Sequence, residues 1–429
     1  MFVIKYNGMK TNIQLLKGFR DFLPDDMAFQ NWFYESLKRI SESFGFQEYN
    51  GPTIESLDLY AAKSGEELVK KQAFTFEDKS GKTVALRPEM TPSLARIVSQ
   101  NENNLTFPVK WFTYGRRFRY ESPQKGRGRE FFQWDVDILG TDTPEADAEV
   151  ITIAANFYQK LGLTPDEVKI KINDRQNLES KLESIGVPKE RTSSLIKVID
   201  KKNKVNETDF KEMLKEASLT DKQVQQTLDI LQDKNGYQES DWLKTIFSYL
   251  EKAGVASYIE YDASIVRGLD YYTKTVFEGW DVKGDFRAIW GGGRYDSLTS
   301  DVGSKTKIPG VGFAMGDMVI EEILRYYNKY PTLTVNKTKA LVTIFSPELM
   351  SESLKFSTKL RREGINCEIY SDPKAKLEKQ LKYADKKGIP FAIILGPEEV
   401  ATDTVTIKNM STQTQKKVFN NSISSLLNS

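Results

Sequence analysis

Residues 109–139 read VKWFTYGRRFRYESPQKGRGREFFQWDVDIL, and this segment is the most informative about the architecture. Both of its ends are rich in aromatic and β-branched residues, which favour strands. Its middle is polar and contains two glycines and a proline, which favour a turn or loop. The segment therefore predicts a long β-hairpin with strands at 109–121 and 131–139, joined by a loop over 122–130.

The hairpin carries an unusual concentration of arginine. Residues 116–129 hold six basic side chains and one acid. Side chains alternate across a strand, so Arg117, Arg119 and Glu121 share one face at the base of the loop. An arginine on a rigid strand can bind a phosphate through two parallel N–H groups. Charge alone fits an anion site and a solvated hairpin with a basic tip equally well.

The return strand is also polar on one face. Alternation places on this face Phe131, Gln133, Asp135 and Asp137. Two acids and an amide that face the protein interior are costly unless they bind something. The other interpretation is that this face of the sheet is in contact with water, as one face of an antiparallel sheet commonly is.

The composition restricts the chemistry. The chain has 429 residues, 61 Lys and Arg against 60 Asp and Glu, no histidine, and one cysteine, Cys367. These counts exclude catalysis by a histidine base, a disulfide within the chain and a cysteine-rich metal site. Arginines, carboxylates, tyrosines and a borrowed magnesium ion remain. They favour catalysis by positioning and electrostatics, as in phosphoryl or nucleotidyl transfer.

The N-terminal segment bears on localisation. It reads MFVIKYNGMKTNIQLLKGF and has no apolar run as long as a signal peptide or a membrane span. A single cysteine is consistent with a reducing compartment. We therefore expect a cytoplasmic protein with no membrane partner.

The rest of the chain alternates between helical and extended patterns. Apolar spacing predicts helices at 25–44, 145–161 and 316–327. Residues 175–260 are rich in Lys, Glu, Asp and Leu, which predicts a helical insertion between two β-rich halves. After a polar linker at 329–338, strand-like and helical segments alternate. This last pattern predicts a compact α/β domain of about 95 residues.

Three short glycine-containing motifs give weaker signals. No GxxxxGK[ST] pattern occurs, and GVGFAMG at 310–316 has the wrong spacing for a dinucleotide site. RGLDYY at 267–272 combines a cation, an acid and two phenols. GGGRYD at 291–296 allows close approach of the backbone, although a bulged strand explains the glycines as well.

Taken together, these motifs resemble those of the histidyl-tRNA synthetase family, a class II aminoacyl-tRNA synthetase family. GFRDFLP at 18–24 resembles its motif 1 region, and LRPEMT at 86–91 resembles its amino-acid-binding strand end. Residues 118–140 resemble motif 2. RGLDYYTKTVFE at 267–278 resembles the stretch peculiar to the histidine enzymes, and the segment 291–316 resembles the motif 3 region.

The resemblance implies an α+β fold in two domains. Residues 1–330 would form the catalytic domain, an antiparallel sheet flanked by helices, with the helical insertion at about 175–260. Residues 331–429 would form an α/β anticodon-binding domain. The resemblance also implies a homodimer whose substrates are ATP with Mg²⁺, L-histidine and tRNA(His).

The implied reaction has two steps. Histidine attacks the α-phosphate of ATP to give histidyl-adenylate and pyrophosphate, and the 3′-terminal adenosine of the tRNA then takes the histidyl group. In the family, the motif 2 arginine and the arginine of RGLDYY surround the α-phosphate, and they match Arg119 and Arg267. The attacking carboxylate is already ionised, so this step needs no protein base.

The resemblance also implies a histidine pocket. Its residues are expected to be Glu89, Thr91, Gln133, Asp137, Arg267, Tyr271, Tyr272 and Tyr295. The first three would hold the α-amino group, and the imidazole would lie between Asp137 and Tyr272. An amino acid without both ring nitrogens would leave buried polar groups unpaired, which gives strong rejection.

The ATP site follows the family pattern with one departure. Its expected residues are Arg119, Glu121, Arg127 and Phe131, with the phenyl ring stacked on adenine. The family usually carries an arginine in the helix after VGFAMG, which closes the other face of the adenine and approaches the γ-phosphate. The matching residue here is Val319. Arg325 lies about 240° further round the helix and is not an obvious replacement.

Two other readings stay open from the sequence. The regulatory subunit of ATP phosphoribosyltransferase has the same catalytic fold without aminoacylation, and Val319 favours it. The C-terminal domain and the intact RGLDYY motif count against it. A class II synthetase for threonine or proline would share the C-terminal domain, but RGLDYY argues against that reading too.

Overall fold

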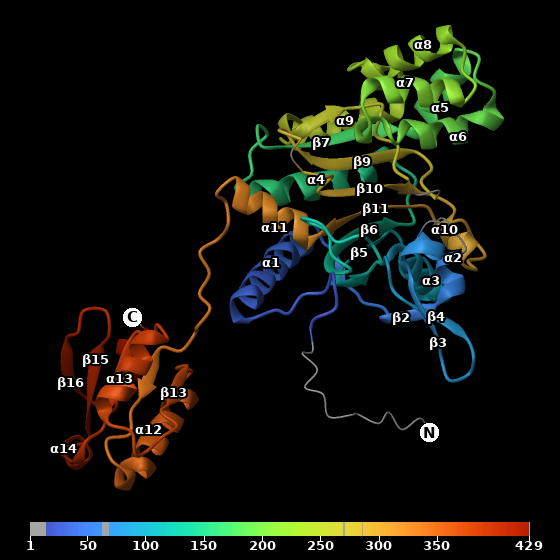
Figure 1. Cartoon of the computed structure of the whole chain (residues 1–429). Coiled ribbons are helices and arrows are strands. Elements are labelled where there is room, and N and C mark those ends of the chain that lie inside the picture. Colours follow the sequence, from blue (N-terminus) through green and yellow to red (C-terminus); the bar gives the residue numbers. More distant parts are fainter. Residues whose placement is uncertain (1–13, 62–67, 269–270, 285, 429) are drawn as a thin grey trace. The chain divides into compact units, whose positions relative to one another are not determined.

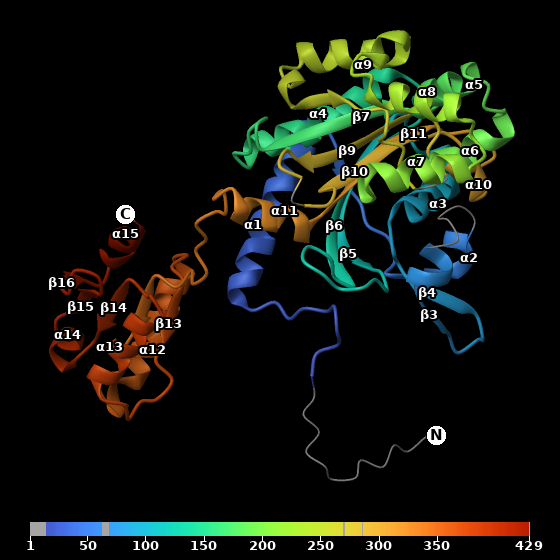
Figure 2. The ribbon, with the colours of Figure 1, turned by 45° about the horizontal axis from the view of Figure 1, so that its top comes forward.

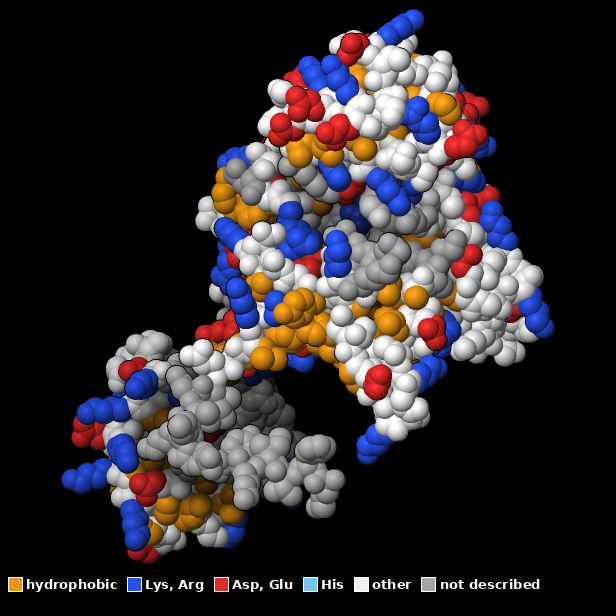
Figure 3. Space-filling view, turned by 45° about the vertical axis from the view of Figure 1, so that its right-hand side comes forward, with side chains coloured by type: hydrophobic (Ala, Val, Ile, Leu, Met, Phe, Trp, Pro, Cys, Tyr) orange, Lys and Arg blue, Asp and Glu red, His pale blue; other side chains and the backbone are white. Residues whose placement is uncertain are grey.

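The computed structural model describes residues 14–61, 68–268, 271–284 and 286–428. Of the described residues, those at 14–22 and 29–331 form one compact unit, and those at 23–28 and 332–428 form a second. Within the described residues, no helix is both long enough and apolar enough to cross a membrane. Figure 3 shows acidic and basic side chains interspersed on the visible face of the large unit, as the near-zero net charge suggests.

The large unit is built on an eight-stranded sheet (Figure 1). In spatial order its strands are β1 (Gln47–Glu48), β5 (Val109–Phe118), β6 (Glu130–Leu139), β11 (Gly310–Gly316), β10 (Trp290–Tyr295), β9 (Thr275–Asp281), β7 (Val168–Asp174) and β8 (Ile259–Tyr261). Neighbours are antiparallel except at the two edges, where β1 pairs with β5 and β7 pairs with β8 in parallel. The hairpin predicted from the sequence is β5–β6, at the predicted place.

Strand register brings the acidic strand β6 against two glycine-rich strands. Asp137 lies opposite Gly312 of β11, and Gly312 lies opposite Gly293 of β10. A methyl group added at Gly312 would come 2.0 Å from Oδ1 of Asp137. The missing side chains of β10 and β11 therefore leave room for the carboxylate.

The other face of β6 packs on helices. Trp134 contacts Phe157 of α4 (Pro144–Lys160) and Phe313 of β11, each with 4.9 Å between ring centroids. Phe33 of α1 (Pro24–Ser43) also packs on Phe157, with 5.6 Å between the rings. The apolar stripe predicted for α1 is buried from Phe29 to Ile40. Helix α11 (Asp317–Tyr326) packs on β6 as well.

A small layer of structure stands beside the hairpin. It contains a three-stranded sheet of order β2 (Ile54–Ser56), β4 (Thr83–Leu86) and β3 (Phe74–Glu77), with α2 (Leu57–Ala61), the π-helical turn Leu68–Gln72, α3 (Thr91–Asn101) and α10 (Leu298–Asp301). The segment between β4 and α3 bonds to the hairpin, because the Arg87 guanidinium donates from Nε to the Arg116 carbonyl at 2.9 Å.

Residues 175–260 form the predicted helical insertion, visible at one end of the sheet in Figure 2. Its helices are α5 (Arg175–Ser184), α6 (Lys189–Ile199), α7 (Glu207–Glu216), α8 (Asp221–Gln232) and α9 (Asp241–Lys252). Helix α9 is fixed to α4, since Trp242 donates to Oδ2 of Asp147 at 3.1 Å.

Short 3₁₀ segments occur at Glu102–Asn104, Lys202–Lys204, Gly236–Glu239, Ala256–Tyr258 and Pro347–Leu349.

The small unit is a five-stranded α/β structure. Its sheet has the order β13 (Cys367–Ile369), β12 (Ala340–Val342), β14 (Phe391–Ile394), β15 (Thr404–Asn409) and β16 (Gln415–Phe419). The helices are α12 (Met350–Arg362), α13 (Leu377–Lys386), α14 (Pro397–Ala401) and α15 (Ile423–Asn428). The sequence pattern missed β16, because this edge strand is polar and mostly exposed and so lacks an apolar alternation.

Candidate active site

One cavity of about 490 Å³ opens on the polar face of the sheet. It brings together every residue for which the sequence predicted a role, from segments up to 206 residues apart: Glu89, Thr91, Arg119, Glu121, Arg127, Phe131, Gln133, Asp137, Arg267, Tyr271, Tyr272 and Tyr295. The alternation predicted for β6 is confirmed, since Phe131, Gln133, Asp135 and Asp137 all line this cavity. Gln133, Asp135 and Asp137 are buried, so the interpretation of a water-facing sheet surface is wrong.

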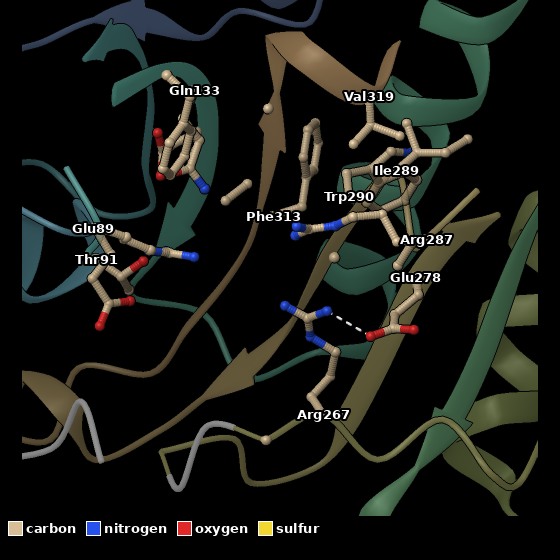
Figure 4. A pocket seen from close by; sticks show the side chains of 18 of the residues that line it. Glu89, Thr91, Gln133, Arg267, Glu278, Arg287, Ile289, Trp290, Phe313 and Val319 are labelled. Carbon is tan, nitrogen blue, oxygen red and sulfur yellow. Dashed lines mark hydrogen bonds and ion pairs between the residues drawn. The ribbon is translucent and has the colours of Figure 1, made fainter. Parts of the chain in front are cut away.

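Arg267 occupies the middle of the cavity (Figure 4). Its Nη1 donates to Oε1 of Glu278 at 2.5 Å, and the other carboxylate oxygen of Glu278 accepts from Trp280 at 3.0 Å. Burial lowers the pKa of Arg267, but Glu278 and the phenol of Tyr272 outweigh burial and raise it above its ordinary value. Arg267 is therefore a fixed, permanent cation.

The backbone around Arg267 is specialised. Its φ is +56°, a left-handed conformation that is uncommon for a residue with a side chain. The guanidinium lies over Gly291 of β10, where an added methyl group would come 2.2 Å from Nη1. One of the three glycines at 291–293 is thus needed for the arginine to reach the cavity.

Arg119 lies just past the end of β5. Its Nε donates to the Pro88 carbonyl at 2.9 Å, and its guanidinium carbon lies 5.5 Å from the centre of the Phe131 ring. The hydrogen bond to the Pro88 carbonyl fixes one edge of the Arg119 guanidinium, and the Phe131 ring covers one of its faces. The remaining N–H groups stay available to a ligand in the cavity.

The loop between β5 and β6 is closed by an ion pair between Glu121 and Arg127. Burial raises the pKa of Glu121, but Arg127 and then Arg119 lower it more, so the carboxyl stays ionised at neutral pH. The loop also rests on α11: a methyl group at Gly126 would lie 3.2 Å from Cγ2 of Val319. The short side chain at position 319 is thus covered by the loop.

The deep end of the cavity is acidic. Tyr295 donates its hydroxyl proton to Oδ1 of Asp137 at 2.7 Å, and both side chains are buried. Burial raises the pKa of Asp137 well above its usual range; the Tyr295 hydrogen bond opposes this and the nearby Asp135 adds to it. The Asp137–Tyr295 pair can accept a hydrogen bond from a ligand.

Two further tyrosines and an amide complete this end. Tyr271 donates to Oε2 of Glu89 at 3.2 Å, and the rings of Tyr271 and Tyr272 lie 4.8 Å apart. Oε1 of Gln133 is buried without a hydrogen-bond partner among the described residues. An unpaired buried acceptor is costly, so this atom is suited to receive a donor from a ligand.

The structure adds residues that the sequence did not assign. Arg117 and Asp135 form a fully buried ion pair at 2.7 Å beneath the cavity. Glu278, within the 267–278 motif, orients Arg267. Arg287, from the connection between β9 and β10, also lines the cavity. A charged residue inside an apolar strand could have indicated Arg117, but no sequence pattern marks Arg287.

Arg325 does not enter the cavity. It pairs with Glu321 at 2.8 Å, and its guanidinium carbon lies 3.7 Å from the centre of the Tyr330 ring. The expectation that Arg325 does not replace an arginine at position 319 is therefore confirmed.

The acidic and cysteine side chains of the described residues bear on metal binding. They contain no group of three acidic or cysteine side chains placed to hold an ion. The nearest carboxylates, Glu121 and Glu278, are already paired with arginines. We therefore take magnesium as part of the nucleotide substrate.

The fold and the cavity together define a class of protein. A mainly antiparallel sheet carries a cavity that is lined by two arginines, a basic hairpin loop and an acid–phenol pair. This is the catalytic unit of a class II aminoacyl-tRNA synthetase. A sequence profile for histidyl-tRNA synthetase matches residues 18–318, and one for an anticodon binding domain matches residues 339–429. The chain belongs to the histidyl-tRNA synthetase family.

Relatives of known name agree with this assignment. A histidine–tRNA ligase of Picrophilus torridus is 39% identical over 422 residues, which cover 95% of this chain and 97% of that protein. One from Leptospira biflexa is 34% identical over 418 residues, 95% of each chain. The crystal structure of histidyl-tRNA synthetase from Nostoc sp. PCC 7120 superimposes with a TM-score of 0.81 at 26% identity, covering 98% of this chain and 99% of that one.

The fold alone is shared more widely. A Bacillus halodurans protein described as an ATP phosphoribosyltransferase regulatory subunit/histidyl-tRNA synthetase aligns with a TM-score of 0.70 at 22% identity. The alignment covers 87% of this chain and 96% of that one. Architecture by itself therefore does not separate an aminoacylating enzyme from a regulatory relative.

Proposed function

We propose that this chain activates L-histidine with ATP to form histidyl-adenylate and then transfers the histidyl group to the 3′ end of tRNA(His). The observation that carries the proposal is the cavity itself, whose lining includes Arg119, Arg267 and the hydrogen-bonded pair Asp137–Tyr295. Full-length similarity to histidine–tRNA ligases supports the same reaction.

In the activation step, a carboxylate oxygen of histidine forms a bond to the α-phosphorus of ATP. The bond from that phosphorus to the oxygen bridging to the β-phosphorus breaks, and pyrophosphate leaves with the electron pair. Arg119 and Arg267 stabilise the negative charge that builds on the α-phosphate. Both guanidiniums are held before the substrate binds, which avoids reorganisation during the reaction.

Histidine is recognised at the acidic end. Asp137 accepts a hydrogen bond from one imidazole nitrogen, and Tyr272 pairs with the other. The α-amino group donates to Glu89, Thr91 and Gln133. The buried Oε1 of Gln133, which lacks a partner in the described residues, supports this last assignment. A side chain without two ring nitrogens leaves the acid unpaired and is rejected.

ATP binds across the hairpin. Arg127 and Glu121 contact the nucleotide near its phosphates, and Phe131 stacks on the adenine. The Glu121–Arg127 pair has to loosen for this, because its charges now satisfy each other. Magnesium enters with the nucleotide, where it neutralises phosphate charge.

The small unit reads the tRNA, as its match to anticodon binding domains supports. We also propose a cytoplasmic homodimer. Exposed apolar side chains in the segment that precedes α1, such as Leu16 and Leu23, support a contact with a second copy. Sedimentation at the mass of one chain would rule out the dimer.

The discriminating experiment is aminoacylation of a tRNA(His) transcript with radiolabelled amino acids. We expect charging with histidine and with none of the other standard amino acids. Charging with threonine or proline would favour another class II specificity. A folded protein that binds histidine but charges no tRNA would favour a regulatory role.

A further inference from the structure

Arg287 is held at the cavity by its neighbours in the connection between β9 and β10. The backbone of Phe286 donates to Asp281 at 3.2 Å, and its ring meets the edge of Tyr326 of α11 with 5.4 Å between centroids. Lys125 of the hairpin loop lies 5.2 Å over the same ring. On the other side, Ile289 donates to the Gly279 carbonyl at 2.8 Å. Phe286 and Ile289, which flank Arg287, are thus held in place, and Figure 4 shows Arg287 among the side chains that line the cavity.

The surroundings of Arg287 are positively charged. Four arginines line the described cavity: Arg119, Arg127, Arg267 and Arg287. The first three are engaged, Arg119 with a carbonyl and a ring, Arg127 with Glu121 and Arg267 with Glu278. Arg287 has no hydrogen bond or ion pair to any described residue. Partial desolvation and then the charge of Arg127 lower the pKa of Arg287.

Such an arrangement is unfavourable without a ligand. Like charges brought together in a partly desolvated cavity repel each other, and Glu121, the described acid that acts most on Arg287, is already neutralised by Arg127. A polyanion in the cavity would relieve this repulsion and supply acceptors for the Arg287 guanidinium, whose planar fork suits phosphate oxygens. The ligand that matches is the triphosphate of the nucleotide.

We propose that Arg287 binds the β- and γ-phosphates of ATP and stabilises the departing pyrophosphate, a contact supplied from the β9–β10 connection and not from position 319 of α11. This inference rests on the proposed function. When the bond between the α-phosphorus and the bridging oxygen breaks, the charge that moves onto pyrophosphate is met by Arg287. Arg119 and Arg267 act on the α-phosphate.

The test compares Arg287→Ala and Arg287→Lys with Arg325→Ala as the control. Arg325 also carries one positive charge, but it is exposed and outside the cavity. Binding of inorganic pyrophosphate and of adenosine is measured by calorimetry, and the KM for ATP and for histidine by pyrophosphate exchange. Loss of one charge-assisted contact should weaken the binding of ATP and of pyrophosphate about tenfold to a hundredfold in Arg287→Ala. Adenosine binding and the KM for histidine should stay within about twofold, and lysine should restore part of the loss.

Two results would overturn the inference. One is an unchanged affinity for both ATP and pyrophosphate in Arg287→Ala. The other is an equal weakening of adenosine binding, which would show that Arg287 contacts the nucleoside. Failure of the proposed function is separate: the unaltered protein would then show no histidine-dependent exchange, whereas the effect on pyrophosphate binding can be measured without any reaction.

Discussion

Single residues of the cavity carry charges that are fixed before the substrate binds. Arg267 is held by Glu278, Arg119 by the Pro88 carbonyl, and Asp137 by Tyr295. Each of these side chains keeps hydrogen-bonding capacity that its protein partner does not use. The cavity therefore offers fixed hydrogen-bonding groups before any substrate binds, as the proposed activation of histidine requires.

The substitution Asp137→Asn tests whether Asp137 contributes to histidine binding. Asparagine keeps the shape and can still accept from Tyr295, but it lacks the negative charge. We expect the KM for histidine to rise about tenfold or more while the KM for ATP changes little. Steady-state pyrophosphate exchange measures both. A normal KM for histidine would remove Asp137 from the pocket.

The raised pKa of Asp137 also predicts a pH effect on folding. A carboxyl with a raised pKa in the folded state binds its proton more tightly there than in the unfolded chain. Its favourable contribution is complete at acidic pH and is lost as the pH rises through the folded pKa. Asp137→Asn should thus raise the melting temperature at pH 8 more than at pH 5. Equal shifts at both pH values would contradict a raised pKa.

The sequence could predict the site residues that lie in motifs, but it could not predict their pairing. Asp135 lies opposite Thr113, so Arg117 reaches it only by extending its side chain past Gly115, where an added methyl group would lie 3.4 Å from Nη1. Arg287 could not be found because it belongs to no motif, and its position depends on the packing of Phe286 on Tyr326. A motif identifies a site residue from its neighbours in the sequence, whereas the partner of that residue depends on how the whole chain folds.

At the scale of elements, the glycines of β10 and β11 shape the cavity. Gly291→Ala would place a methyl group 2.2 Å from Nη1 of Arg267, and the flexible end of the arginine would have to move. We expect the exchange rate to fall at least tenfold with little change in melting temperature, because a shift of about 1 Å at a reacting group costs about a hundredfold.

The matched control for Gly291→Ala is Gly316→Ala, where an added methyl group meets only ordinary contacts at 3.9 Å or beyond. Both variants add the same atoms to strands of the same sheet. Loss of activity in both would point to a general intolerance of side chains in these strands and would argue against a specific displacement of Arg267.

Elements with strong periodicity were predicted well, and polar edge elements were not. Helix α1 and the β5–β6 hairpin were found within a few residues, because apolar spacing marks their buried faces. Strand β16 was missed because it pairs with β15 through its backbone while its side chains stay mostly exposed. A strand that buries few side chains lacks the alternation of apolar and polar residues that predicts a strand.

At the scale of the whole molecule, chemistry and tRNA reading are assigned to different units. A chain that ends at Pro331 retains every described side chain of the cavity. It should keep pyrophosphate exchange within a few-fold of the full chain, while its charging of tRNA(His) falls a hundredfold or more. Parallel loss of both activities in a folded fragment would show that the small unit is not a separate tRNA reader.

The central claim is that the cavity forms histidyl-adenylate through preorganised arginines. Its most direct test is histidine-dependent ATP–pyrophosphate exchange on the purified chain, with Arg267→Ala measured beside it to exclude contaminating enzyme. We predict exchange that requires histidine and falls about a hundredfold to a thousandfold in the variant, on the order of 3 kcal/mol of transition-state stabilisation. Absence of exchange from the folded, unaltered protein, or undiminished exchange in Arg267→Ala, would contradict the claim.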